Sequence, residues 1–158
     1  MRTRYRPFAA AMAGALLLAG CNNLQDELPP RIEVGAEVTS VSNGFFIEGC
    51  RNAVFRLSES TAKQLKERGI AFLREAPASS GQAHRYSEWI ETPVELPEGR
   101  SIFDAMPVLP CGEQSDFPAR EIESALRARG SFYALTDNGE GMLLVAPRQR
   151  LAAVFYVG

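Results

Sequence analysis

The sequence predicts an α+β fold: a single small domain with a mainly antiparallel sheet, two helices, one disulfide and a C-terminal three-stranded meander. Three observations predict it. Short apolar or alternating segments recur between residues 31 and 157, as strands require. Two other segments combine helix start signals with a closing glycine. The 138 residues from position 21 onward suit one domain with one core.

The first predicted elements are strands. Residues 31–41 alternate apolar and polar side chains with a period of two. Asn43-Gly44 is typical of a tight hairpin turn, so residues 45–47 are expected to return as the paired strand. A further short strand is predicted over residues 53–57.

A helix is predicted over residues 59–68, because Ser58 can cap its first turn. Gly69 is expected to end this helix in a left-handed conformation. Residues 70–75 are then expected to form a strand, and residues 84–92 another one.

Four prolines lie between residues 93 and 111, which predicts an irregular segment. A second helix is predicted over residues 121–129. Pro118 stands where a first helical residue would, and Gly130 closes the helix.

Residues 132–136, 142–146 and 151–157 are predicted to form the three-stranded meander, with a turn at residues 137–140. Residues 151–157 are apolar throughout, which favours a central strand buried on both faces. The alternative is an edge strand, whose open backbone groups would accept the strand of a partner.

The first twenty residues have the layout of a secretory signal. Three arginines within the first six residues precede an apolar run over residues 8–19. This run is too short to cross a bilayer as a helix, which needs about twenty residues. It leads into the sequence Leu18-Ala19-Gly20-Cys21. The segment resembles the signals of bacterial lipoproteins, and the resemblance covers these residues alone. It implies cleavage before Cys21 and acylation of this cysteine.

The resemblance divides the chain into three parts. Residues 1–20 are the lipoprotein signal peptide, residues 21–30 are a polar lipid-anchored tether, and residues 31–158 are a periplasm-facing domain. Acyl chains on Cys21 would attach the protein to a membrane of the cell envelope. Asn22 replaces the Asp that is associated with inner-membrane retention in enterobacterial lipoproteins, which favours the outer membrane.

The charge of the cleaved chain opposes binding to nucleic acid. The full chain has 17 basic and 19 acidic residues, and three of the basic residues precede Cys21. Cleavage therefore leaves 14 basic and 19 acidic residues, a net charge of −5. Nucleic acid requires a basic surface instead.

Two cysteines, Cys50 and Cys111, remain besides Cys21. An even pair in an oxidising compartment is typical of a disulfide. A redox or nucleophilic thiol is the alternative, but no Cys-x-x-Cys motif supports it. We therefore expect a disulfide between Cys50 and Cys111.

Residue types for catalysis are sparse. His84 is the only histidine, which excludes a site built from several histidines. Four glutamates recur at spacings of three and four, but two prolines break the helix that would align them. They are Glu88, Glu91, Glu95 and Glu98. No phosphate-binding loop or dinucleotide fingerprint is present. The sequence therefore predicts no catalytic residue, no cofactor and no metal.

Residues 65–69 and 126–130 share a pattern at an offset of 61 residues: each has a basic last turn and a final glycine. Duplication of a helix-to-strand unit is one interpretation. The other is that cations and glycine commonly close helices. Arg148 and Arg150 flank the last predicted turn, where they either hold an anionic group or are simply solvated.

Two functions fit these features. The first is a non-catalytic, lipid-anchored binding or assembly accessory, or an inhibitor, with a protein partner in the envelope. The second is a small envelope hydrolase that uses His84 or the carboxylates between Glu88 and Glu98. The lack of a convergent catalytic pattern favours the first.

Overall fold

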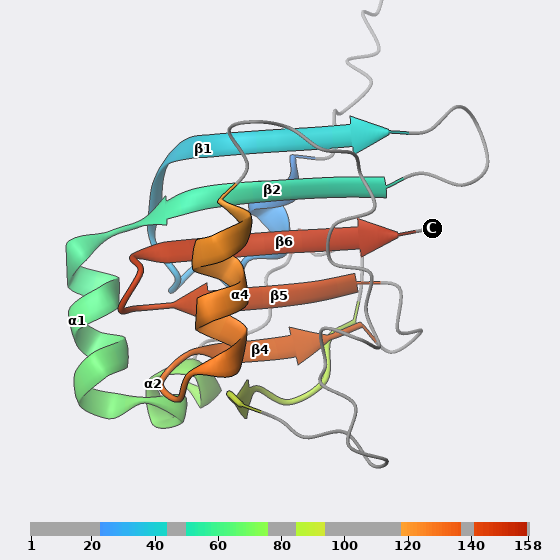
Figure 1. Cartoon of the computed structure of the whole chain (residues 1–158). Coiled ribbons are helices and arrows are strands. Elements are labelled where there is room, and N and C mark those ends of the chain that lie inside the picture. Colours follow the sequence, from blue (N-terminus) through green and yellow to red (C-terminus); the bar gives the residue numbers. More distant parts are fainter. Residues whose placement is uncertain (1–22, 44–49, 76–84, 94–117, 137–140, 158) are drawn as a thin grey trace, which may run out of the picture.

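The computed structural model describes residues 23–43, 50–75, 85–93, 118–136 and 141–157. They form a mixed α+β domain around a six-stranded antiparallel sheet with the strand order β1-β2-β6-β5-β4-β3 (Figure 1). The strands are β1 (Val34–Asn43), β2 (Cys50–Leu57), β3 (Ile90–Glu91), β4 (Phe132–Leu135), β5 (Gly141–Ala146) and β6 (Leu151–Val157). The helices are the 3-10 helix η1 (Leu24–Glu27) and the α-helices α1 (Glu59–Arg68), α2 (Ile70–Arg74) and α4 (Ala119–Arg127).

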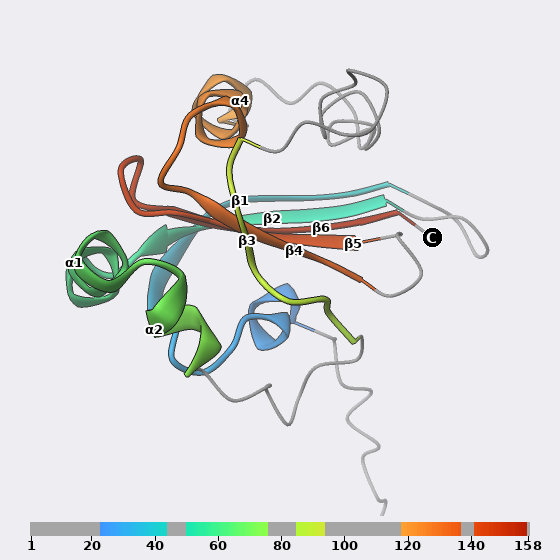
Figure 2. The same ribbon diagram turned by 90° about the horizontal axis from the view of Figure 1, so that it is seen from below.

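Both faces of the sheet are covered by helices. Figure 2 shows α4 on one face and η1, α1 and α2 on the other. Alternate residues of the inner strands divide between two cores: Leu143 of β5 packs on the η1 and α1 side, and Leu144 packs on the α4 side. This alternation follows from the period of two along a strand. The fold is therefore three layers, with the sheet in the middle.

Strand β6 lies at the centre of the sheet, between β2 and β5. Its residues Ala152, Ala153 and Val154 are at most 1% exposed. The predicted central position is confirmed, because an entirely apolar strand is stable only when both of its faces are covered. The alternative of an edge strand that accepts a partner is wrong.

The tight turn predicted at Asn43-Gly44 is wrong, although β1 does pair antiparallel with the next strand along the chain. Strand β1 pairs with β2, and Ser42 lies opposite Arg51 and Asn43 opposite Cys50, so the connection spans six residues. The predicted return strand, residues 45–47, lies outside the described residues. Strand β2 is buried along most of its length, with Phe55 in one core and Val54 in the other, so it pairs as an inner strand between β1 and β6.

Helix α1 has the predicted bounds, and the hydroxyl of Ser58 accepts a hydrogen bond from the backbone N–H of Thr61 at 3.1 Å. Gly69 ends the helix at a φ of 56°, as expected for a residue without a Cβ. The strand predicted over residues 70–75 is instead helix α2. Short apolar runs do not distinguish strand from helix by periodicity, and here Phe72 and Leu73 are buried against the sheet.

Two further elements differ in extent from the prediction. Of the strand predicted over residues 84–92, the described residues 85–92 hold a strand at Ile90–Glu91 alone, together with an isolated bridge between Tyr86 and Thr136. The second predicted helix is α4, which begins at Ala119, with Pro118 as its capping residue. The described residues thus hold three α-helices and one 3-10 helix where two helices were predicted.

The described part of the predicted tether, residues 23–30, is folded onto the domain. Helix η1 contacts β2 and β6, and Leu28 is only 4% exposed. The Tyr86 hydroxyl donates a hydrogen bond to the Glu27 carboxylate at 3.1 Å. Burial raises the pKa of Tyr86 well above its ordinary range, and Glu27 raises it further, so the donor stays protonated. The prediction of a free tether failed because two apolar residues, Leu24 and Leu28, are enough to pack this mainly polar segment against the domain.

The three-layer arrangement can be tested on β2. Phe55→Ala should lower the free energy of unfolding by about 3–5 kcal/mol, because it leaves a cavity in the core between the sheet and η1. Arg56→Ala is the matched control, since the neighbouring side chain is exposed and should change stability by no more than about 0.5 kcal/mol. Urea denaturation measures both values. Equal effects of the two substitutions would contradict the assignment of faces.

Candidate functional site

A cavity of about 310 Å³ lies at one end of the sheet. It is formed where the corner between α1 and α2, the start of β4 and the β5–β6 connection come together (Figure 1). Leu65, Ile70 and Phe132 form an apolar floor. Lys66, Glu91 and Arg148 are exposed and form a charged rim. Both features are common in ligand sites, which combine apolar lining with a few polar groups.

Two glycines complete the lining, and both have positive φ angles. Gly69 has a φ of 56° and Gly130 a φ of 92°. A Cβ placed on Gly130 would lie 3.6 Å from Nε and 3.8 Å from Cζ of Arg148. The guanidinium group therefore lies directly over the Gly130 backbone. A glycine is needed here for the backbone conformation, whereas a Cβ would make only an ordinary van der Waals contact with Arg148.

These glycines close the two segments that share a pattern at the offset of 61 residues. After Gly69 the chain continues into helix α2, whereas Gly130 leads into strand β4. The two units therefore differ in structure after the glycine, which overturns the interpretation as duplicated helix-to-strand units. Only Gly69 caps its helix: α4 ends at Arg127 with Ala128 as its capping residue, so the predicted closure of the second helix by Gly130 is wrong.

The charged groups of the rim have no ionic partner within the described part of the chain. Lys66, Glu91 and Arg148 make no side-chain hydrogen bond or ion pair there, in contrast to Arg31, Arg68 and Glu75 close by. Charges of both signs thus surround the same cavity without neutralising one another. The arrangement can hold a charged ligand without first breaking a salt bridge.

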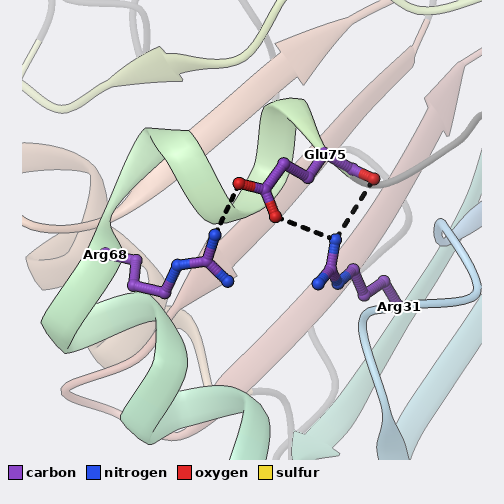
Figure 3. Close-up of polar contacts among 3 residues, drawn as sticks. All are labelled: Arg31, Arg68 and Glu75. Atoms are coloured by element: carbon purple, nitrogen blue, oxygen red, sulfur yellow. Dashed lines mark hydrogen bonds and ion pairs between the residues drawn. The ribbon is translucent and has the colours of Figure 1, made fainter.

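A three-residue ionic cluster braces the corner between α1 and α2. Glu75 accepts hydrogen bonds from Arg68 at 2.5 Å and from Arg31 at 3.2 Å, and the Arg31 guanidinium also donates to the Glu75 carbonyl oxygen at 3.3 Å (Figure 3). The Arg31 and Arg68 guanidinium carbons lie 5.1 Å and 5.9 Å from the centre of the Phe72 ring, within cation–π range. Arg68 first, then Arg31, holds the pKa of Glu75 below its usual value.

Thr92 braces the opposite side of the cavity and is 2% exposed. Its hydroxyl lies 2.5 Å from the Ala128 carbonyl oxygen, to which it donates, and accepts a hydrogen bond from the backbone N–H of Ser131. The Thr92 backbone N–H donates to the Ser131 carbonyl oxygen at 2.9 Å. These bonds fix β3, which carries Glu91, against the turn that contains Gly130. Sequence reasoning did not find Thr92, since no local pattern marks it.

The residues proposed from the sequence are placed only in part. Cys21, His84, Glu95, Glu98 and Cys111 lie outside the described residues. Cys50 is buried at the start of β2. Glu88 and Glu91 are both exposed, and Glu91 alone of this pair lines the cavity.

Of the two arginines that flank the last turn, Arg148 lines the cavity and Arg150 does not. Lys66 was not predicted as a site residue. Its only signal was its place in the last turn of α1, three residues before Gly69. Within the described residues no group of three or more His, Cys, Asp or Glu side chains could hold a metal ion.

Comparison of the chain with family models, with curated proteins and with solved structures gave no match. In the described part of the chain, no helix has the length and apolar character needed to cross a bilayer.

The ionic cluster should make stability depend on pH. Because folding lowers the pKa of Glu75, the carboxylate stabilises the fold above its ordinary pKa of 4.5, and this contribution is lost as the pH falls through the lowered value. The stability difference between the wild type and Glu75→Gln should thus be constant near neutral pH and shrink below pH 4.5. Denaturation curves from pH 7 to about 3 measure it.

Arg68→Ala provides the control for this experiment. Since Arg68 is the main cause of the lowered pKa, Glu75→Gln should have a smaller effect in the Arg68→Ala background than in the wild type. If the difference in unfolding free energy between the wild type and Glu75→Gln stays the same over the whole pH range, the cluster does not stabilise the fold through the charge of Glu75.

Proposed function

We propose that the chain is a lipid-anchored protein of the cell envelope that faces the periplasm and binds a partner without catalysing a reaction. The anchor is Cys21, at the end of the lipoprotein-like signal. The observation that carries the binding function is the cavity, whose rim holds charges of both signs that have no ionic partner among the described residues, over an apolar floor. Such a site offers recognition by charge and by shape.

The composition of the cavity favours binding over catalysis. None of its described lining residues is Ser, Thr, Cys or His, so it contains no hydroxyl or thiol nucleophile next to a base. A protein of this kind acts as an accessory to an envelope assembly or as an inhibitor. Its net charge of −5 after cleavage leaves nucleic acid as an unfavourable partner.

The second candidate is the small envelope hydrolase. It is favoured by one observation: Glu91, one of the four glutamates proposed from the sequence, lies at the cavity. Such an enzyme would use Glu91 or His84 in acid–base catalysis. Mild cross-linking of the anchored protein separates the candidates, because an accessory or inhibitor forms a lasting complex with an envelope protein.

Anchoring predicts the behaviour of a Cys21→Ala variant. The wild-type protein should carry an acyl mass on residue 21 and fractionate with membranes, and Cys21→Ala should lose both properties because no acyl chain remains to partition into the bilayer. Asn22→Ala is the matched control and should remain acylated. Mass spectrometry of the N-terminal peptide and membrane fractionation give the result. Retention of Cys21→Ala in the membrane, together with an unmodified wild-type cysteine, would contradict the anchor.

We also propose that Cys50 and Cys111 form a disulfide. Closing a loop of about 60 residues restricts the unfolded chain and stabilises the fold by about 4 kcal/mol on the loop-entropy estimate. Peptide mapping without reductant should find both cysteines in one linked fragment, and the double variant Cys50→Ala/Cys111→Ala should unfold at lower urea. Free thiols at both positions in protein isolated from the envelope would refute the bond.

A further inference from the structure

We propose that the cavity binds a small zwitterion, namely a free α-amino acid or a dipeptide with apolar side chains. This inference rests on the proposed binding function and names the class of its ligand. Lys66 and Arg148 would hold the carboxylate, Glu91 would hold the ammonium group, and the apolar side chain would lie on Leu65 and Phe132. The volume of about 310 Å³ is at the small end of ligand cavities, which suits a ligand of this size.

The charges of the rim favour a zwitterion over a simple anion. A carboxylate or phosphate could bind to Lys66 and Arg148, but it would leave Glu91 facing the same cavity without a partner. A ligand with both charges satisfies both signs at once. Because the described residues give none of these side chains an ionic partner, each is available for a charge-assisted hydrogen bond.

The guanidinium group of Arg148 suits the carboxylate end of the ligand. Arg148 packs beside Gly130 and makes no hydrogen bond or ion pair with the described residues, so its planar guanidinium group can receive a carboxylate with two parallel hydrogen bonds. Helix α1 ends at the cavity, and the C-terminal end of a helix carries partial negative charge. The basic residues Lys66 and Arg68 in the last turn of α1 offset this charge, so the helix end does not oppose a carboxylate at Lys66.

The floor determines the character of the ligand side chain. Leu65 and Phe132 are buried members of the core between the sheet and α1, and Ile70 packs against that core. Since Leu65 and Phe132 are themselves almost fully buried, a ligand side chain in contact with them gains mainly by removing its own apolar surface from water. Leucine, rather than a polar amino acid, is therefore the first probe to use.

The experiment uses the full lipidated protein in detergent and isothermal titration calorimetry with four probes. They are leucine, the dipeptide leucyl-leucine, N-acetyl-leucine, which lacks the ammonium group, and leucinamide, which lacks the carboxylate. Leucine or the dipeptide should bind, and each of the two blocked compounds should bind at least about tenfold more weakly, because each loses one set of charge-assisted hydrogen bonds. Inorganic phosphate should bind more weakly than either zwitterion.

Variants then assign the two ends of the ligand. Arg148→Ala should weaken the zwitterion at least about tenfold, whereas Arg150→Ala, in the same turn but outside the cavity, should leave its affinity unchanged. Glu91→Gln should remove the preference for leucine over N-acetyl-leucine. A variant that merely damages the fold would weaken all probes alike, and circular dichroism checks the fold of each one.

Two results would overturn the proposal: no binding of either zwitterion up to millimolar concentration, or binding of N-acetyl-leucine or phosphate as tight as that of leucine. The second result would identify a simple anion site. Failure here is distinct from failure of the proposed function, since the lipid anchor and a cross-linked envelope partner are detected independently of any amino acid.

Discussion

The whole structure depends on the burial of both faces of the inner strands. β2, β5 and β6 carry apolar side chains on alternate sides, and burying each large one stabilises the fold by about 1.5–3 kcal/mol. A sheet of this kind is stable only with a layer on each face. One face is covered by α4, and the other is shared by η1, α1 and α2 (Figure 2). The helices are thus placed by the sheet, and their own propensities matter less.

The cavity lies at one end of the sheet, beside the corner between α1 and α2. Two connections contain a glycine with positive φ: Gly69 ends α1 at the corner to α2, and Gly130 lies between the end of α4 at Arg127 and the start of β4. The ionic cluster around Glu75 holds the first connection, and the buried hydrogen bonds of Thr92 hold the second. Exposed ion pairs contribute little to stability on average, so the main effect of the Glu75 cluster is to position the corner. The rim charges are therefore presented by a fixed backbone.

Elements with local signals could be predicted from the sequence. Ser58 and Gly69 mark the ends of α1 through capping hydrogen bonds and backbone conformation, and both are properties of single residues. The central place of β6 followed from its uniformly apolar composition. Tertiary contacts decided the rest. The Asn43-Gly44 sequence predicted a tight turn, but β1 pairs with β2 instead. The apolar run at residues 70–75 is compatible with the period of a strand and with that of a helix, and in the fold it is helical. The site combines residues 66, 91 and 148, which only the strand order brings together, so no spacing could reveal it.

The docking of residues 23–30 changes what a lipid on Cys21 would mean for the protein. Only Asn22 separates that cysteine from Asn23, which already caps η1, so the free linker spans about 7 Å at most. The domain would then be held close to the membrane surface and could not extend far into the periplasm. It would lie on the bilayer with the η1 side inward and α4 outward, and it would meet its partners by lateral diffusion in the plane of the membrane.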